Sequence, residues 1–321
     1  MSVIANVIRP FWLKGLNDIN GRVTKSLGEW FLESDYQIYV PIQEKTFTLN
    51  SSNHEKILSA FAFDCSRMAM SSFESITAIS KHGGFPKSIA WPVIQAYYAT
   101  FFAAHSILRM LGTSCTQISA EHAKAIGRVA VVFGQSNGVK IAGGLYACVY
   151  DSKTKTLNCT NIQAGSGGVH ENFWKIFNDE ITGLNKRILG LPVADTVKQS
   201  VLLKFAELQS SMRQGSKKNG SWLSFVRNEV NYRHGLGTWY PYKDYKPYYN
   251  QFVTNYAKWN HDPMDIDVSL SASKELENFQ NISLFIVSLC RVLSEDMETR
   301  CSTGTSFHYY KSLAVLKLLE A

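Results

Sequence analysis

The segment from Ser221 to Tyr242 places an arginine, two asparagines and a histidine at spacings that could serve chemistry. On an ideal helix, Arg227 and His234 differ by about 20° around the axis, and Asn231 lies about 40° from Arg227. Asn228 is displaced by about 100°. A guanidinium stays charged and stabilises developing negative charge, whereas an imidazole gives or takes a proton near neutral pH. The set could therefore support proton transfer beside a developing anion.

One helix must position these side chains. Ser221 is a suitable N-cap, Gly235 is a suitable C-terminal stop, and the helix is expected to reach His234. Glu229 and Arg233 would point away from the Arg227 face. The residues that would hold the helix to a core are apolar: Trp222, Phe225, Val226 and Val230.

Chance alone gives part of this pattern. In a chain with 8 histidines and 11 arginines, about 0.8 Arg–His pairs separated by four to six residues are expected at random. Requiring an asparagine directly after the arginine lowers the expectation to about 0.05. The Arg-Asn pair within a helix is therefore the informative part of the pattern.

The sequence RNEVNYRH, residues 227–234, resembles the R-x4-6-H signature of the HEPN superfamily, in which a polar residue often follows the arginine. The earlier segment WPVIQAYYATFFAAHSILRMLG resembles the aromatic and alanine-rich helix common in HEPN proteins. Together the two segments cover under a fifth of the chain. The first 80 residues and the β segments match no part of the family pattern.

The resemblance implies a metal-independent endoribonuclease that works as a homodimer, with two motifs meeting across the interface. Arg227 and His234 would be the catalytic pair, supported by Asn228. Such enzymes often act in anti-phage defence or toxin–antitoxin growth arrest, so an antitoxin or a sensor or activator protein is an expected partner. No cofactor and no metal are implied.

This activity is chemically reasonable for these residue types. RNA carries its own nucleophile, the 2′-OH, so a metal-activated water is unnecessary. His234 could move the proton, Arg227 could stabilise the phosphorane, and Asn228 or Asn231 could orient the phosphate or the imidazole. The products would be a 2′,3′-cyclic phosphate and a 5′-OH end.

The flanking segments could bind RNA. The loop before the helix holds Arg213, Lys217 and Lys218, which could contact phosphates, although such loops are often only solvated. The segment after the helix interleaves aromatic residues with lysines, which suits stacking on unpaired bases. Those aromatic residues could equally pack a core or a dimer. The residues proposed for RNA binding here are Trp239, Tyr240, Lys243 and Lys246.

The apolar periodicity predicts a mainly α fold, a HEPN-like helical bundle with short β-hairpin insertions. An N-terminal helical and β-hairpin region, residues 1–80, would pack on a HEPN-like helical domain, residues 81–321. The predicted helices cover the first 34 residues and 54–80, 88–112, 171–189, 194–213, 221–234 and 271–298, with a short C-terminal helix last. Hairpin strands are expected within 36–50 and 143–162.

Two features in the middle of the chain allow more than one interpretation. His105 lies in an apolar helical stripe, which favours a core histidine over a catalytic one. The segment AGSGGVHENF, residues 164–173, could cradle a phosphate, but it matches no phosphate-loop motif and is interpreted as a flexible connection.

Composition narrows the class of protein. Hydrophobic residues make up 45% of the chain, enough for a sizeable core, and the formal charge of +7 slightly favours an anionic partner such as nucleic acid. The six cysteines show no metal-ligand spacing and indicate reduced thiols in a cytoplasmic protein. No apolar run reaches 18 residues, and the N-terminus is a poor signal peptide, so no membrane association is expected.

Two alternatives to the ribonuclease stay open. The chain could be a non-catalytic HEPN-like binding or scaffold module that works with a partner subunit. It could also be a helical protein unrelated to HEPN. Dimerisation through the 221–234 helix, and a cleft shared by Arg227 and His234, would distinguish the ribonuclease from both.

Overall fold

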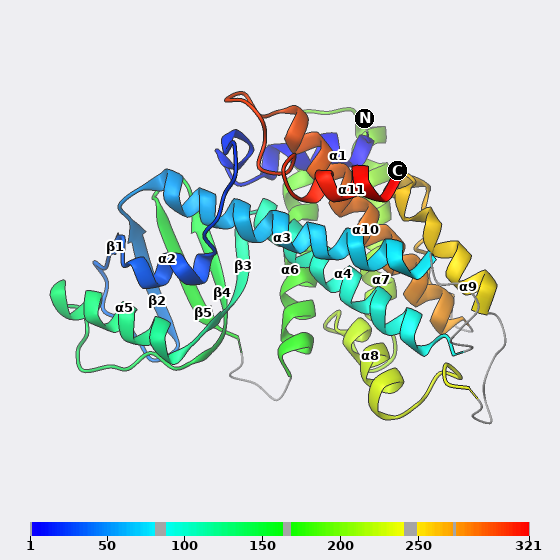
Figure 1. Ribbon diagram of the computed structural model, residues 1–321, viewed down its shortest axis with the longest axis horizontal. Coiled ribbons are helices and arrows are strands. Elements are labelled where there is room, and N and C mark those ends of the chain that lie inside the picture. Colours follow the sequence, from blue (N-terminus) through cyan, green and yellow to red (C-terminus); the bar gives the residue numbers. More distant parts are fainter. Residues whose placement is uncertain (1, 81–87, 163–167, 241–248, 272–273, 321) are drawn as a thin grey trace.

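The computed structural model describes residues 2–80, 88–162, 168–240, 249–271 and 274–320. The fold is mainly α, with a small antiparallel sheet (Figure 1), as the sequence predicts. Its α-helices are α1 (Val3–Ile8), α2 (Leu27–Glu33), α3 (His54–Ser80), α4 (Ala90–Met110), α5 (Ala120–Val132), α6 (Val169–Leu189), α7 (Asp195–Met212), α8 (Trp222–Tyr232), α9 (Tyr249–Asn255), α10 (Glu275–Thr299) and α11 (Ser312–Glu320).

The strands form one five-stranded sheet in the order β1-β2-β5-β4-β3, antiparallel throughout. The strands are β1 (Tyr36–Gln37), β2 (Thr46–Ser51), β3 (Thr113–Ile118), β4 (Gly144–Asp151) and β5 (Thr156–Asn161). The predicted hairpin at 143–162 is confirmed as β4 and β5. The first 80 residues contribute β1 and β2 to the same sheet, because β2 pairs with β5 from Thr46↔Thr160 to Asn50↔Thr156.

The sequence prediction of the elements is wrong at several points. The first 34 residues do not form one helix: Pro10 falls in a 3₁₀ turn, and Gly15 and Gly21 adopt positive φ. The predicted strand YQIYVPI pairs over only two residues, after which the chain leaves the sheet and Ile42 N–H donates to the Gln135 carbonyl oxygen. The strand β3 and the helix α5 were not predicted.

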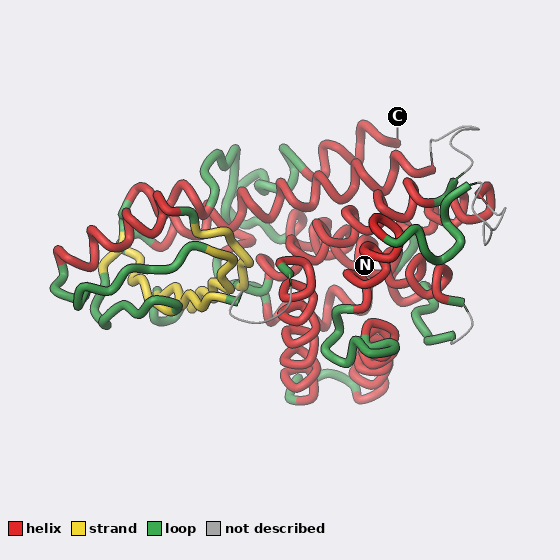
Figure 2. The backbone as a smooth tube through the Cα atoms, turned by 90° about the horizontal axis from the view of Figure 1, so that it is seen from below, coloured by secondary structure: helices red, strands yellow, loops and turns green. Residues whose placement is uncertain are grey.

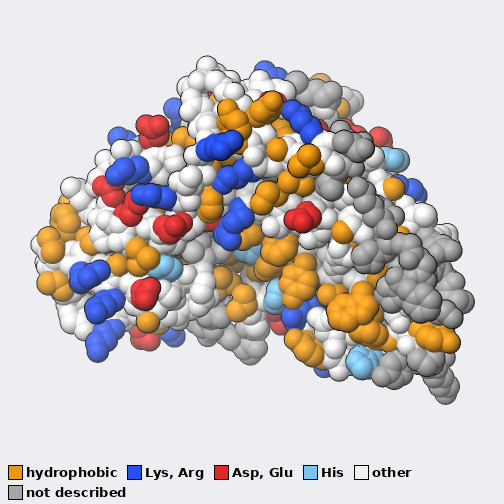
Figure 3. Space-filling model, in the orientation of Figure 1, with side chains coloured by type: hydrophobic (Ala, Val, Ile, Leu, Met, Phe, Trp, Pro, Cys, Tyr) orange, Lys and Arg blue, Asp and Glu red, His pale blue; other side chains and the backbone are white. Residues whose placement is uncertain are grey.

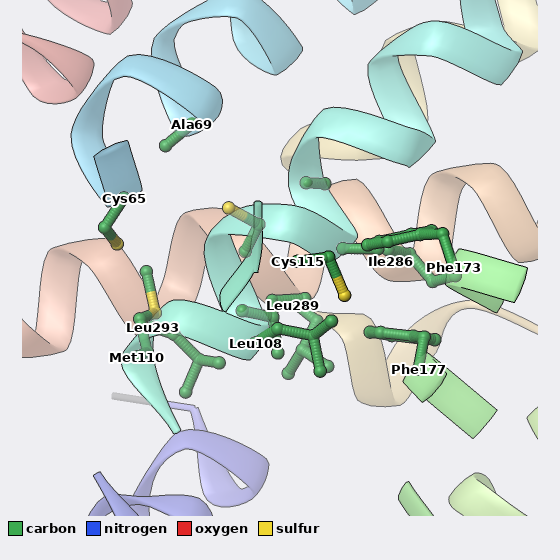
Figure 4. Close-up of a cluster of buried hydrophobic side chains, with 14 of the residues drawn as sticks. Cys65, Ala69, Leu108, Met110, Cys115, Phe173, Phe177, Ile286, Leu289 and Leu293 are labelled. Carbon is green, nitrogen blue, oxygen red and sulfur yellow. The ribbon is translucent and has the colours of Figure 1, made fainter. Parts of the chain in front are cut away.

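The sheet lies at one end of the molecule, flanked by α2 and α5, and the other helices form the rest (Figures 1 and 2). Helix α3, 27 residues long, runs from the sheet across the helical part and packs along α4. The core between them takes side chains from α3, α4, α6 and α10, including Cys65, Leu108, Phe173 and Leu289 (Figure 4). This packing fixes α4 and α6, two helices that α8 contacts.

The C-terminal segment lies against the N-terminal segment. Asn20 and Ser306 form an isolated bridge, and Lys311 Nζ donates to the Val23 carbonyl oxygen at 2.8 Å. All six cysteines are free thiols. Within the described ranges, no helix is both long and apolar enough to span a membrane.

Candidate functional site

Helix α8 is amphipathic and seats its apolar face on α4 and α6. Trp222, Leu223, Val226 and Val230 are buried, whereas Arg227 is half-buried and Asn228 is exposed. Ser221 is the N-cap residue of α8, as predicted, but its hydroxyl donates to Asn219 Oδ1 at 2.6 Å and makes no capping bond to the helix. The apolar stripe, and not a cap, positions Arg227.

A glycine sets how closely the start of α8 approaches α6. Gly220 has a φ of +86°, and a Cβ there would lie 2.5 Å from Asn178 Cβ. Asn178 also accepts a hydrogen bond through Oδ1 from Arg213 Nε at 3.0 Å. Arg213, expected to contact phosphates, is therefore hydrogen-bonded to α6 in the free protein.

The Arg227 guanidinium lies among uncharged groups. Nη1 donates to Asn228 Oδ1 at 3.0 Å, Nη2 donates to the Tyr98 hydroxyl at 3.3 Å, and the Tyr232 ring centroid lies 5.4 Å from Cζ. Asn228 therefore reaches Arg227 despite its angular displacement on the helix. Among the described residues, no carboxylate oxygen lies within 4.0 Å of this guanidinium, so no carboxylate of those residues pairs with its charge.

His234 is not on the helix. The prediction of a helix to His234 is wrong by two residues, because α8 ends at Tyr232 and His234 has a φ of 52°, in the left-handed region. The Gly235 N–H donates to the Glu229 carbonyl oxygen at 2.9 Å and closes the helix end. The angular alignment of Arg227 with His234 therefore does not apply.

His234 lies in the turn after α8, where it is exposed and its ring lies against the indole of Trp239. Its ring centroid lies 5.4 Å from that of Trp239, whose Nε1 donates to the Val230 carbonyl oxygen at 2.7 Å. Trp239 is half-buried and also packs against Trp91 at 5.6 Å. Asn231 is half-buried on the last turn of α8.

The remaining residues proposed to bind RNA differ in their surroundings. Lys217 forms an ion pair with Glu171 at 3.6 Å, and Lys218 is exposed. Tyr240 is 49% exposed, and two further aromatic residues are exposed, Trp91 on α4 (54%) and Tyr232 on α8 (70%). Hydrophobic side chains gather on the surface over α8 (Figure 3). Lys243 and Lys246 lie outside the described residues.

Sequence reasoning missed the histidine that lies beside Arg227. His170, in the first turn of α6, is half-buried, and its Nδ1 lies 2.9 Å from the Tyr97 hydroxyl. The Tyr97 oxygen also accepts a hydrogen bond from Trp174 Nε1 at 3.0 Å. Burial, together with the Arg227 charge, lowers the pKa of His170 to about 4. At neutral pH, this ring is uncharged.

His105 is a core histidine, as predicted. It is 6% exposed and stacks on Phe173 with ring centroids 3.9 Å apart. Its Nδ1 accepts from Arg109 Nη1 at 3.1 Å. Burial and then the Arg109 charge lower the pKa of His105 well below its ordinary value.

No group of metal-ligating side chains occurs in the part of the chain that the structure describes. The chain matches no family model, and comparison with curated proteins and with solved structures gave no match. The function is therefore inferred from the residues around Arg227.

Proposed function

We propose that this chain is a metal-independent endoribonuclease that cleaves RNA by 2′-OH transesterification, in a homodimer that brings two Arg227 sites together. The observation that supports it is a half-buried arginine whose charge no described carboxylate neutralises. Arg227 is hydrogen-bonded to the Asn228 amide and the Tyr98 hydroxyl, and the His170 imidazole packs on the Tyr98 ring. Such a guanidinium can stabilise the charge that develops on the phosphorane oxygens.

His234 is the proposed proton-transfer group. It is exposed just after α8, where its ring lies against Trp239, which in turn packs against the exposed Trp91. In a dimer formed through this part of the surface, His234 of one protomer could lie near Arg227 of the other. The same aromatic residues offer faces for unpaired bases, which suits a single-stranded target. Anti-phage defence or growth arrest is the proposed role, with a partner protein restraining the activity.

The test is cleavage of total RNA in EDTA by the wild type, Arg227→Met and His234→Asn. Asparagine is chosen because it tolerates the positive φ of His234, so loss of activity would not reflect backbone strain. We expect 5′-OH ends from the wild type and at least a hundredfold loss in both variants. Arg233→Met, which removes an exposed arginine paired with Glu229, is the matched control.

Two results would count against the proposal. Cleavage that survives in both variants would show that another site does the chemistry. A homodimer that binds RNA without cleaving it would favour the scaffold alternative, in which Arg227 recognises a ligand only.

A further inference from the structure

Three polar groups from three helices meet beside α8. Arg227 comes from α8, Tyr98 from α4 and His170 from α6. Arg227 Nη2 and the Tyr98 hydroxyl are 3.3 Å apart, and the Tyr98 and His170 rings meet edge to face with centroids 6.1 Å apart. Tyr98 thus contacts both other groups.

The direction of the hydrogen bonds behind this cluster follows from the donors available. The indole N–H of Trp174 can only donate, so the Tyr97 oxygen is its acceptor. Tyr97 is fully buried, and its hydroxyl proton needs an acceptor, which His170 Nδ1 supplies at 2.9 Å. A neutral His170 whose Nδ1 accepts must carry its proton on Nε2.

Burial, and then the Arg227 charge, keep the His170 ring neutral. Arg227 acts on it from α8. The α4 side offers the phenols of Tyr97 and Tyr98 and the buried imidazole of His105, which is itself hydrogen-bonded to Arg109. The neighbouring acid on α6, Glu171, is paired with Lys175 at 3.7 Å and Lys217 at 3.6 Å. No free carboxylate therefore competes for the donors of the cluster among the residues described.

We propose that Arg227, Tyr98 and the Nε2–H of His170 form a binding site for a phosphate group of an RNA strand, with the Trp174–Tyr97 pair fixing the His170 tautomer. The guanidinium supplies the charge, and the phenol and the neutral imidazole supply directed donors. The site rests on the proposed function for its ligand, but each protomer contains all of its groups. Tyr97 and Trp174 are positioning residues, because they act through His170.

The test is NMR of histidine-¹⁵N-labelled protein at pH 7.5, with His170 assigned from His170→Gln. Long-range ¹H–¹⁵N spectra should show the Nε2–H tautomer of His170. Titration with sodium phosphate, against sodium chloride of equal ionic strength, should shift the His170 signals saturably. A 2′-deoxy oligonucleotide, which cannot be cleaved by this route, should shift the same signals. His122, which caps α5 beside the sheet, is the internal control and should not move.

Variants separate the roles. Arg227→Met should raise the phosphate Kd at least about tenfold, because a charge-assisted bond is lost, and should raise the pKa of His170. Tyr98→Phe should weaken binding with the tautomer unchanged. Tyr97→Phe and Trp174→Phe should instead mix the two tautomers.

Three outcomes would overturn the inference. They are an Nδ1–H tautomer in the free protein, His170 signals that do not shift on addition of phosphate or of the oligonucleotide, and an equal shift of the His122 signals. The two proposals fail separately. Phosphate binding without RNA cleavage would reject the ribonuclease proposal and support the phosphate site. RNA cleavage with His170 signals that do not shift would reject the phosphate site alone.

Discussion

At the scale of single residues, the geometry of Arg227 matters as much as its charge. Its two terminal nitrogens donate in different directions, to Asn228 Oδ1 and to the Tyr98 hydroxyl. A lysine keeps the charge but has one flexible ammonium, which cannot reproduce this fork. Arginine and lysine should therefore differ in catalysis more than in binding.

For Arg227→Lys we expect an RNA Kd within about threefold of the wild type, because the charge remains, and a kcat lower by about a hundredfold, because a positioned donor is lost. Single-turnover cleavage and filter binding would measure the two effects. Arg233→Lys is the control on the same helix. Equal kcat values for Arg227→Lys and the wild type would show that charge alone is sufficient.

The neighbours of Arg227 mark the limit of sequence reasoning at this scale. The Arg-Asn pair could be found because both residues lie on one segment, and their contact is local. Tyr98 is 129 residues from Arg227 along the chain, and Tyr97 is 73 residues from His170. The packing of α4, α6 and α8 brings these side chains together. The spacing of residues within one segment cannot predict such contacts between helices.

At the scale of elements, helical periodicity predicted α3, α4, α6, α7 and α10 well, because each has an apolar stripe long enough to identify. The strand β3 is short and follows α4 after a single turn, so its sequence shows no clear alternation. The turn after α8 was missed for a different reason. Glycine usually takes the left-handed position at a helix end, but here His234 takes it, one residue before Gly235.

The loop before α8 offers a sharp test of how this helix is held. Gly220→Ala should destabilise the protein by about 2 to 5 kcal/mol, from positive φ at about 1–2 kcal/mol and overpacking against Asn178 at about 1–3 kcal/mol. Gly215→Ala is the matched control, since its φ is +57° and a Cβ would meet nothing within 4 Å.

Urea unfolding followed by circular dichroism would measure both variants. The control should lose only the backbone contribution, about 1–2 kcal/mol. If the two variants were equally stable, the close approach of Gly220 to Asn178 would not limit the docking of α8 on α6.

At the scale of the whole molecule, buried neutral histidines make the fold sensitive to acid. Burial lowers the pKa of His308 to about 3, and the pKa of His105 also lies well below its ordinary value. Because unfolding restores a pKa near 6.5, the unfolded state binds more protons below that pH. The contribution of each neutral histidine to the free energy of unfolding should be complete above about pH 6.5. It should fall by about 1.4 kcal/mol per pH unit for each group as the pH drops toward the folded pKa values.

His308→Asn tests this dependence. His308 Nδ1 lies 2.7 Å from the Ser312 hydroxyl, and an asparagine amide can occupy the same place. Between about pH 6.5 and 4.5, the free energy of unfolding of the variant should fall less steeply with pH than that of the wild type. The slopes should differ by about 1.4 kcal/mol per pH unit, the contribution of one proton, whatever the stability of the variant at about pH 7.5. Urea midpoints at four pH values would give the slopes, and parallel slopes would contradict the assignment.

The sheet joins strands that are distant along the chain, and this has a consequence during synthesis. Strand β2 ends at Ser51, but its partner β5 begins only at Thr156. At about 5–20 residues per second, a ribosome needs roughly 5 to 20 s to add the intervening residues. For that time, the nascent chain carries β2 without its β5 partner, with Phe47 and Leu49 available to other chains. Chaperone binding to this segment should therefore end when β5 leaves the exit tunnel.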